Sequence, residues 1–458
     1  MIRSANTWVA SVLLFCSAYA TCATCATYAT AQLYEGARLI PGDGGAAIES
    51  SAFLVERGVI VRVGRKGELN APAGVPRVDL SGKTVMPALI STHVHPGFQK
   101  GLSYGAGNYT REVILNDLNV ALYYGISTVM SQGIERGDLA LQIRAEQETG
   151  KAGGARLLVA GRGIGAPNAG PGALAYKDIA YEVTTDEQIR QAVREQAARK
   201  VNAIKIWVDD RGGRAPSLSP ALSRAAADEA HKHKLRIAVH VYYHKDASEL
   251  AAAGVDSFAH LVRDKVMDDA LIALVVKNGV YVMPNMGGGE RTTHTTTPGW
   301  FEEPYLAAML RDTTSPDVIE RMKGLFAPRD PKVVETVRAT YSNVHNNTTR
   351  LNAAGSRIIL GCDTGLPDHL FGYAEQRELE LMAAAGMTAM QVIVAATSRG
   401  AEYLGLNDSG ALTAGKRADF LVLDANPLDD IRNTRRISKM FVKGAEIDRA
   451  ALKASLMK

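Results

Sequence analysis

Val85-Met-Pro-Ala-Leu-Ile-Ser-Thr-His93-Val-His95-Pro96 is the stretch on which the interpretation of this 458-residue chain depends. An apolar run ends in two histidines that lie two positions apart. Because alternate residues of a β-strand point to the same face, we expect both imidazoles to project together from one strand end. Imidazole is a common ligand of zinc and similar metals. The stretch predicts half of a metal site, although two histidines held by structural hydrogen bonds would look the same.

Strand-like and helical segments alternate after His95. Counting from the strand that ends in His93 and His95, the pattern predicts eight strand–helix units, and therefore a parallel sheet. Eight units favour a closed (β/α)8 TIM barrel of the α/β class over residues 86–406. An open doubly wound sheet is the alternative, but no Gly-x-Gly-x-x-Gly turn follows the first strand. The seven further strands are expected at 126–130, 156–160, 203–208, 236–241, 257–261, 280–284 and 357–361.

The two ends of the chain have a different pattern from the middle. Short strands and turns fill residues 32–85, including a hairpin at 52–64 with Gly58 at its turn. From Gly410 onward the chain returns to strands, at 418–424 and 437–442. These patterns predict a small β-sandwich-like domain built from both chain ends, residues 32–85 and 407–458.

The first 31 residues resemble a targeting segment. Arg3 precedes an apolar run at 8–20 that is short for a membrane span, and small-residue sites follow, the second at Ala29-Thr-Ala31. This pattern predicts a cleaved signal peptide over residues 1–31 and a periplasmic or secreted protein, with an uncleaved anchor as the alternative. After cleavage no stable membrane insertion is expected. Only Cys362 of the four cysteines would remain, so no internal disulfide is expected.

Composition limits the kinds of partner. The formal net charge is +4, and 22% of the residues are charged. We find no basic stripe with interleaved aromatic residues, so nucleic acid is not an expected partner. A small-molecule substrate is expected, and a homo-oligomer stays open.

Polar residues end most of the predicted barrel strands. Because active sites of such barrels lie at the C-terminal ends of the strands, side chains at these ends should meet in one place. A single polar residue at a strand end is more often structural, but so many of them at the ends of one set of strands predict a functional site. The residues are His93 and His95 on the first strand, Lys205 within the fourth, His240 on the fifth, His260 on the sixth and Asp363 on the eighth.

Two stretches carry a resemblance to a known family. The first is Gly82-Lys-Thr-Val-Met-Pro-Ala-Leu-Ile-Ser-Thr-His-Val-His95, and the second is Gly410-Ala-Leu-Thr-Ala-Gly-Lys-Arg-Ala-Asp-Phe-Leu-Val-Leu-Asp424. Together with the polar residues at the strand ends, these two stretches make the chain resemble the amidohydrolase superfamily, in its imidazolonepropionase-like and Xaa-Pro dipeptidase-like branch. The resemblance implies a two-metal site, in which one ion is bound by His93, His95 and Asp363, the other by His240 and His260, and a carboxylated Lys205 bridges them.

Lys205 has a physical reason to become carboxylated. A buried lysine has a lowered pKa and is partly neutral, so its amine can react with carbon dioxide to give an anionic ligand. The alternative is an ion pair with Asp209 or Asp210. Zinc is the default metal for these ligand types, and the mixed nitrogen and oxygen set would also accept manganese or cobalt.

The ligand set implies a hydrolytic mechanism. Two divalent ions lower the pKa of a shared water, which gives a hydroxide that attacks a carbonyl carbon. Asp363 would take the proton and pass it to the leaving group. In the dipeptidase-like relatives a tyrosine three residues beyond the fifth-strand histidine polarises the carbonyl oxygen. Tyr243 holds that position here, and a packing role is its alternative.

Departures from the family pattern concern the substrate. The second position after the fifth-strand histidine is Tyr242 rather than histidine, and the loop at 161–170 lacks the histidine that many relatives carry. We predict a metal-dependent amidohydrolase that cleaves the C–N bond of an N-acyl amino acid, a dipeptide or an aryl amide. Hydrolysis of esters, carbamates or ureas is the alternative, and a non-catalytic scaffold is the rival of another class. The candidate substrate-binding residues are Asn108, Tyr109, Arg162, Tyr242 and His369.

Overall fold

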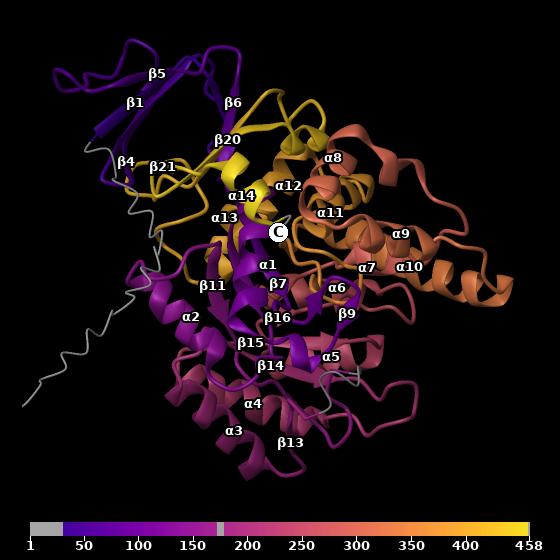
Figure 1. Ribbon diagram of the computed structural model, residues 1–458. Helices are drawn as coiled ribbons and strands as arrows, with labels where there is room; N and C mark the ends of the chain where they lie inside the picture. Colours follow the sequence, from indigo (N-terminus) through magenta and orange to yellow (C-terminus); the bar gives the residue numbers. More distant parts are fainter. Residues whose placement is uncertain (1–30, 172–177, 457–458) are drawn as a thin grey trace, which may run out of the picture.

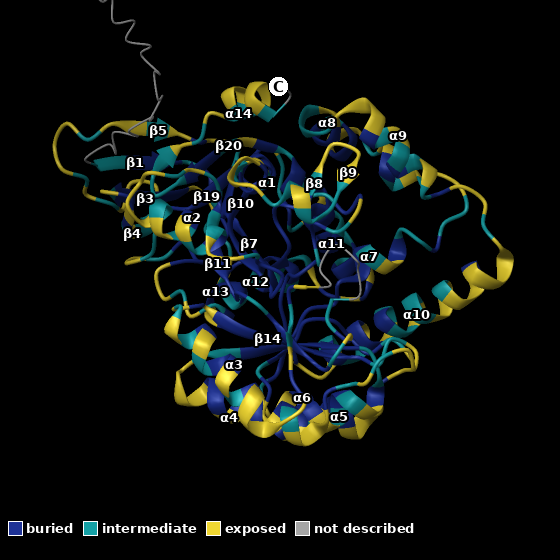
Figure 2. Cartoon of the chain, turned by 60° about the horizontal axis from the view of Figure 1, so that its bottom comes forward, coloured by how far each residue is buried: buried dark blue, intermediate teal, exposed yellow. Residues whose placement is uncertain are grey.

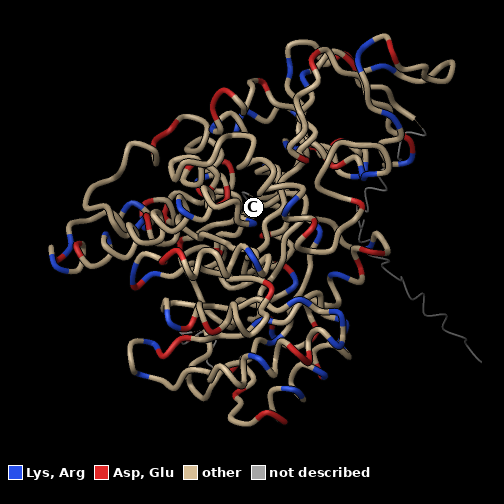
Figure 3. The backbone as a smooth tube through the Cα atoms, turned by 180° about the vertical axis from the view of Figure 1, so that it is seen from behind, with Lys and Arg blue, Asp and Glu red and all other residues tan. Residues whose placement is uncertain are grey.

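The computed structural model describes residues 31–171 and 178–456 (Figure 1). Strand β1 (Ala31–Glu35) begins at the first described residue, so the predicted signal peptide otherwise lies outside the described residues. In the described part of the chain, none of the helices is both long and apolar enough to cross a membrane. Basic and acidic residues are interspersed along the backbone (Figure 3), as the small net charge suggests.

Parallel strands form the centre of the molecule. One sheet has the order β11-β10-β7 and the other has the order β13-β12-β14-β15-β16-β17-β18. Both are parallel throughout, which confirms the predicted α/β architecture of the TIM-barrel type. The strands are β7 (Leu89–Val94), β10 (Ile126–Ser131), β11 (Arg156–Val159), β12 (Ile164–Gly165), β13 (Tyr181–Glu182), β14 (Ala203–Val208), β15 (Arg236–Val241), β16 (Ser257–Phe258), β17 (Tyr281–Val282) and β18 (Arg357–Ile358).

The helices surround these strands. Figure 2 shows buried strands such as β14 in the middle, and helices such as α3 and α4 that are exposed on their outer faces. Thr185 and Gln188 form the capping box that their spacing predicts, and Ser219 caps the helix that begins at Pro220. The helices that follow successive strands are α1 (Arg111–Tyr123), α2 (Leu139–Glu148), α3 (Asp186–Ala198), α4 (Pro220–Lys232), α5 (His244–Ala253), α6 (Asp269–Lys277), α10 (Pro331–Ala353), α11 (Tyr373–Ala384), α12 (Ala389–Ala395) and α13 (Ser398–Tyr403).

The backbone hydrogen bonds do not form the single closed ladder of eight strands that the sequence predicts. The chain passes from one sheet to the other between β11 and β12, and on the opposite side a parallel bridge joins Val94 to Thr364. Thr92 N donates to Leu360 O at 2.9 Å across the same junction. Strands β16, β17 and β18 have only two residues each, because the chain leaves the ladder before its polar strand-end residues.

A long connection separates the last two parallel strands, as the sequence predicts. It contains α7 (Met286–Glu290), α8 (Pro304–Thr313) and α9 (Pro316–Gly324), and it leads into α10. Near the first parallel strand, β8 (Gln99–Lys100) and β9 (Ser103–Tyr104) form a small hairpin. Both segments lie at the end of the sheets where the parallel strands finish.

The chain ends pair with each other, as expected. Strand β6 from the N-terminal part pairs antiparallel with β19 from the C-terminal part, and the two ends lie together in Figure 1. The sheets have the orders β4-β3-β1-β5 and β2-β6-β19-β20-β21. Their remaining strands are β2 (Arg38–Leu39), β3 (Ser51–Glu56), β4 (Val59–Arg65), β5 (Arg77–Asp79), β6 (Thr84–Pro87), β19 (Phe420–Leu423), β20 (Ile437–Val442) and β21 (Ala445–Glu446), and α14 (Arg449–Leu456) ends the described chain.

These two sheets do not form a clearly separate domain. Met86, Leu421 and Met440 belong to the same buried cluster as the parallel strands, so one core continues into the chain-end sheets. A second cluster holds the two sheets to each other. In it Tyr34 stacks on Phe53 at 4.9 Å between ring centres, and Phe420 stacks on Phe441 at 4.4 Å.

We predict that Phe420→Ala lowers the free energy of unfolding by about 3–5 kcal/mol, because Phe420 is fully buried and contacts aromatic rings from both sheets. Urea unfolding of the purified protein measures the change. Val333→Ala is the control, since Val333 is 51% exposed and its truncation should cost less than about 0.5 kcal/mol. Equal unfolding curves for Phe420→Ala and wild type would contradict a structural role for the aromatic cluster.

Candidate metal centre

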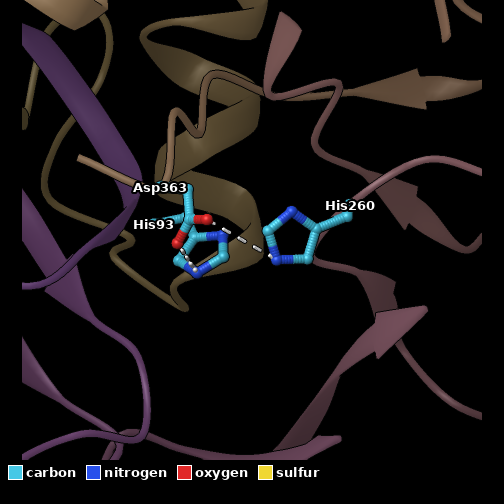
Figure 4. A group of neighbouring side chains, drawn as sticks. All are labelled: His93, His260 and Asp363. Carbon is cyan, nitrogen blue, oxygen red and sulfur yellow. Dashed lines mark ion pairs between the residues drawn. The ribbon is translucent and has the colours of Figure 1, made fainter. Parts of the chain in front are cut away.

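All six predicted ligand residues line one cavity of about 160 Å³. Within it, nitrogen and oxygen atoms of His93, His260 and Asp363 all lie within 4.8 Å of one another (Figure 4). Side chains from both parallel sheets therefore meet in this cavity, as expected for residues at the C-terminal ends of parallel strands. The residues that line the cavity are His93, His95, Ile134, Pro171, Lys205, Trp207, Arg211, His240, His260, Asp363 and Leu366.

Asp363 lies between the histidines. Its Oδ1 is 2.8 Å from His95 Nε2 and 3.3 Å from His93 Nε2, and its Oδ2 is 3.9 Å from His260 Nε2. Burial raises the pKa of this carboxyl, and protonated imidazoles beside it, together with the hydrogen bond to His95, would hold it well below its ordinary value. Asp363 also has a φ of +57°, which a non-glycine residue rarely adopts and which often marks functional positions.

Lys205 is buried in β14 without a carboxylate partner in the described part of the chain. Its Nζ lies 3.1 Å from Gln132 Oε1 and 3.4 Å from His93 Nε2. Burial lowers the pKa of this lysine to about 7, so a large fraction is neutral near neutral pH. Gly133 makes room for it, because a Cβ there would lie 2.6 Å from Lys205 Cγ.

The alternative ion pairs of Lys205 are not formed. Asp209 Oδ2 lies 3.0 Å from His240 Nε2 and accepts a hydrogen bond from Arg211 Nη1 at 2.9 Å. Asp210 accepts a hydrogen bond from the Tyr243 hydroxyl at 2.8 Å. Because Asp209 engages His240 Nε2, the Nδ1 atom of that imidazole is left for another partner.

Asn285 supports two other imidazoles. Its side-chain nitrogen lies 2.9 Å from His260 Nδ1 and 3.3 Å from His93 Nδ1. The Nε2 atoms of both rings then face Asp363. Asn285 follows β17 in a left-handed conformation with a φ of +50°, which asparagine tolerates better than most residues. Sequence reasoning missed Asn285 and Gln132, although both are polar residues just beyond strand ends.

The donor set fits a divalent metal. Burial lowers the pKa of His240 to about 4 and holds those of His93 and His260 well below their ordinary value, so these imidazoles are neutral, as metal ligands must be. Among the described residues His95 Nδ1 is buried without a hydrogen-bond partner. Imidazole nitrogens with a carboxylate are the ligands of zinc and similar ions in proteins.

The predicted substrate-binding residues do not line this cavity. Arg162 donates to Ile179 O at 2.6 Å, and Asn108 donates to Phe98 O at 3.0 Å. Tyr109 packs on Phe98, with ring centres 5.0 Å apart. His369 is buried with Nε2 2.9 Å from Cys362 O.

Tyr242 and Tyr243 also lie outside the lining. Their rings pack on each other with centres 4.8 Å apart. The walls of the cavity are instead Ile134, Pro171, Trp207, Arg211 and Leu366, which sequence reasoning did not select. Only Trp207 carried a usable signal, because it lies two residues after Lys205 and therefore on the same face of β14.

We predict that Asp209→Asn weakens metal affinity about 10–100-fold, since a carboxylate that orients a ligating imidazole contributes this much in comparable sites. Competition of zinc-loaded protein with a chromophoric chelator measures the affinity. Asp210→Asn is the matched control, because Asp210 is adjacent but bonded to Tyr243. Equal affinities of the two variants would contradict the orienting role of Asp209.

Comparison with known proteins gives a consistent picture. A model described as the amidohydrolase family matches residues 84–447. An imidazolonepropionase of Cereibacter sphaeroides is 25% identical over 411 residues, which cover 84% of this chain and 90% of that protein. The first curated relatives are covered less fully: an uncharacterized protein of Mycobacterium tuberculosis is 25% identical over 209 residues, 45% of this chain and 51% of that protein. The chain thus spans about half the length of those first relatives.

Solved structures extend the likeness to nearly the whole fold. The crystal structure of a putative prolidase from Bifidobacterium longum superposes with a TM-score of 0.72 at 26% identity. The match covers 94% of this chain and 100% of that one.

Proposed function

The chain belongs to the amidohydrolase family, and we propose that it cleaves an amide C–N bond in an N-acyl amino acid, a dipeptide or an aryl amide. Membership of this family indicates an enzyme that hydrolyses C–N bonds in a small-molecule substrate. Members of the family are generally metal-dependent. The finer proposal is that the cavity holds two divalent ions, zinc by ligand type, with Lys205 carboxylated.

One observation carries this proposal: six side chains with nitrogen or oxygen atoms that could bind a metal come from five parallel strands and their ends, and they line one cavity. His93, His95 and Asp363 would hold one ion, and His240 and His260 the other. Lys205 would bridge them, and its lowered pKa supports reaction of the neutral amine with carbon dioxide.

The chain's own residues have clear tasks in this chemistry. Bound metal ions would supply a water of lowered pKa and polarise the carbonyl group. Asp363, in the middle of the cavity, takes the proton of the attacking water and returns it to the leaving nitrogen. Trp207, Ile134 and Leu366 form the apolar part of the wall and exclude bulk water.

Two further proposals concern the whole chain. We propose that residues 1–31 direct export to the periplasm or medium, on the strength of the apolar run and the small-residue sites. We also propose that residues 86–406 act as the catalytic unit, and that the strands of residues 32–85 and 407–458 support it through the core that they share.

We expect zinc-loaded protein without residues 1–31 to hydrolyse members of a panel of N-acyl amino acids, dipeptides and anilides. Asp363→Asn should abolish product release, because it removes both a ligand and the proton carrier. Liquid chromatography of the products measures both. If products are released only from esters, carbamates or ureas, the enzyme hydrolyses those bonds instead of amides. No turnover of any substrate with metal bound would favour a non-catalytic scaffold.

Lys205→Ala should lower metal affinity by about tenfold or more, since a ligand is lost. Elemental analysis after dialysis measures bound metal, and reconstitution with and without bicarbonate tests the carboxylation. Lys277→Ala is the control, because Lys277 is exposed at the end of α6. A Lys205→Ala variant with full metal content and activity would contradict the bridging role.

Tyr243 is our candidate for polarising the carbonyl oxygen, a task that requires its hydroxyl to leave Asp210. Tyr243→Phe should then lower kcat about 100-fold while metal content is unchanged, as loss of one such donor does elsewhere. Steady-state kinetics with the best panel substrate measures the effect. An unchanged kcat would leave Tyr243 as a structural partner of Asp210.

A further inference from the structure

Glu375, on helix α11, is a buried carboxylate that the proposed chemistry does not use. Its side chain is fully buried, and among the described residues it forms no ion pair. Three fixed donors offset the cost of burying this charge. Its Oε1 accepts hydrogen bonds from Ser91 Oγ at 3.0 Å and from Thr364 Oγ1 at 2.7 Å, and its Oε2 accepts one from Gly372 N at 2.8 Å. The positions of these donors show what the carboxylate holds together.

Two of the three donors lie next to predicted metal ligands. Ser91 is on β7, two residues before His93, and Thr364 directly follows Asp363. Both hydroxyls are fully buried and both donate to the same oxygen of Glu375. A single carboxylate oxygen therefore joins the strand that ends in the histidine pair to the loop that carries the aspartate.

The loop that carries Asp363 lies tightly against the end of β7. The backbone N of His95 donates to Thr364 O at 2.6 Å, and a Cβ on Gly365 would lie 2.1 Å from His95 O. Asp363 itself has a φ of +57°, and a residue keeps such a conformation only where its surroundings fix it. The hydrogen bond from Thr364 to Glu375 fixes the next residue of the chain from the side opposite the backbone contact. The carboxylate is thus one of the groups that hold the strained turn in place.

We propose that Glu375 is a positioning residue of the metal centre: through Thr364 it fixes Asp363 relative to the two histidines of β7. Glu375 does not line the cavity, so its effect on a bound ion passes through the loop that it holds. A metal ion requires ligand distances within about 0.2 Å of its preferred values, so a small shift of Asp363 would weaken binding. The inference rests on the proposed metal centre and is independent of the proposed substrate.

Four variants test the inference. Glu375→Gln keeps the shape of the side chain, but whichever way its amide turns, at least one donor loses its acceptor. Thr364→Val removes only the hydroxyl, and Thr364→Ser keeps it. Glu380→Gln is the matched control, because Glu380 is a carboxylate of the same helix that is bonded instead to Arg377 at 2.8 Å and to Arg435 at 2.6 Å. If Glu375→Gln does not fold, the two Thr364 variants still decide, since they leave the carboxylate in place.

Zinc affinity is measured by competition with a chromophoric chelator, and ligand geometry by the visible absorption spectrum of the cobalt-loaded protein. We expect Glu375→Gln and Thr364→Val each to weaken zinc binding about tenfold and to change the cobalt spectrum. Thr364→Ser should stay close to wild type. The double variant Glu375→Gln/Thr364→Val should bind about as well as the weaker single variant, because both changes remove the same hydrogen bond. Glu380→Gln should match wild type in both measurements, even where urea unfolding of the metal-free protein shows lower stability.

These measurements separate failure of the inference from failure of the proposed function. Unchanged affinity and spectrum in Glu375→Gln and Thr364→Val would overturn the positioning role and keep the metal centre. Fully additive losses in the double variant, or an equal loss in Glu380→Gln, would also overturn it. The expected losses in a protein that hydrolyses no amide would keep the inference and overturn the proposed hydrolysis. A wild type that binds neither zinc nor cobalt would overturn the metal centre and the inference together.

Discussion

The burial of Lys205 and four imidazoles around Asp363 is the constraint on which the rest of the structure depends. Each of these groups loses hydration when it is buried, and each would be unfavourable alone. Burial lowers the pKa values of His93, His240 and His260, which favours their neutral forms, and fixed polar partners surround the buried groups. Gln132 faces Lys205, Asn285 lies between His93 and His260, and Asp209 holds His240. Ligand atoms of His93, His260 and Asp363 then lie within 4.8 Å of one another, a spacing that a shared metal ion can bridge.

Close packing around the floor of the cavity restricts which side chains can replace those present there. A Cβ on Gly163 would lie 2.2 Å from the Trp207 ring, and one on Gly133 would meet Lys205. The floor is thus built from side chains that fill the space left by glycines. The rim is different, because Arg211, Pro171 and Leu366 come from segments beyond the strands. Substrate preference can change at such a rim while the ligand geometry below stays the same.

The strand-end pattern predicted that the six candidate ligand residues would meet, and they line one cavity, but the pattern did not identify the residues around them. His93, His95, His240, His260 and Asp363 could be chosen because strand ends of a parallel sheet meet at one edge, whatever the exact register. Gln132, Asn285 and Arg211 obey the same rule, but glutamine, asparagine and arginine also end strands for many other reasons. The substrate candidates Arg162 and Asn108 lie in loops whose geometry the sequence does not determine, and in the structure both donate to backbone carbonyls and neither lines the cavity. That strands from the two chain ends pair was expected from the patterns at those ends, whereas the specific β6–β19 pairing and the continuity of the core between the sheets were not.

The position of the ligands relative to the two parallel sheets has a mechanical consequence. His93 and His95 belong to the β7 side, whereas Lys205, His240 and His260 belong to the side of β14, β15 and β16. Few backbone hydrogen bonds cross between β7 and the chain after β18, among them that from Thr92 to Leu360. A bound ion shared by these residues would therefore act as a cross-link that fastens one sheet to the other. With a metal bound at this centre, its occupancy and the cohesion of the two sheets would be linked, and a chelator would then lower the stability of the fold.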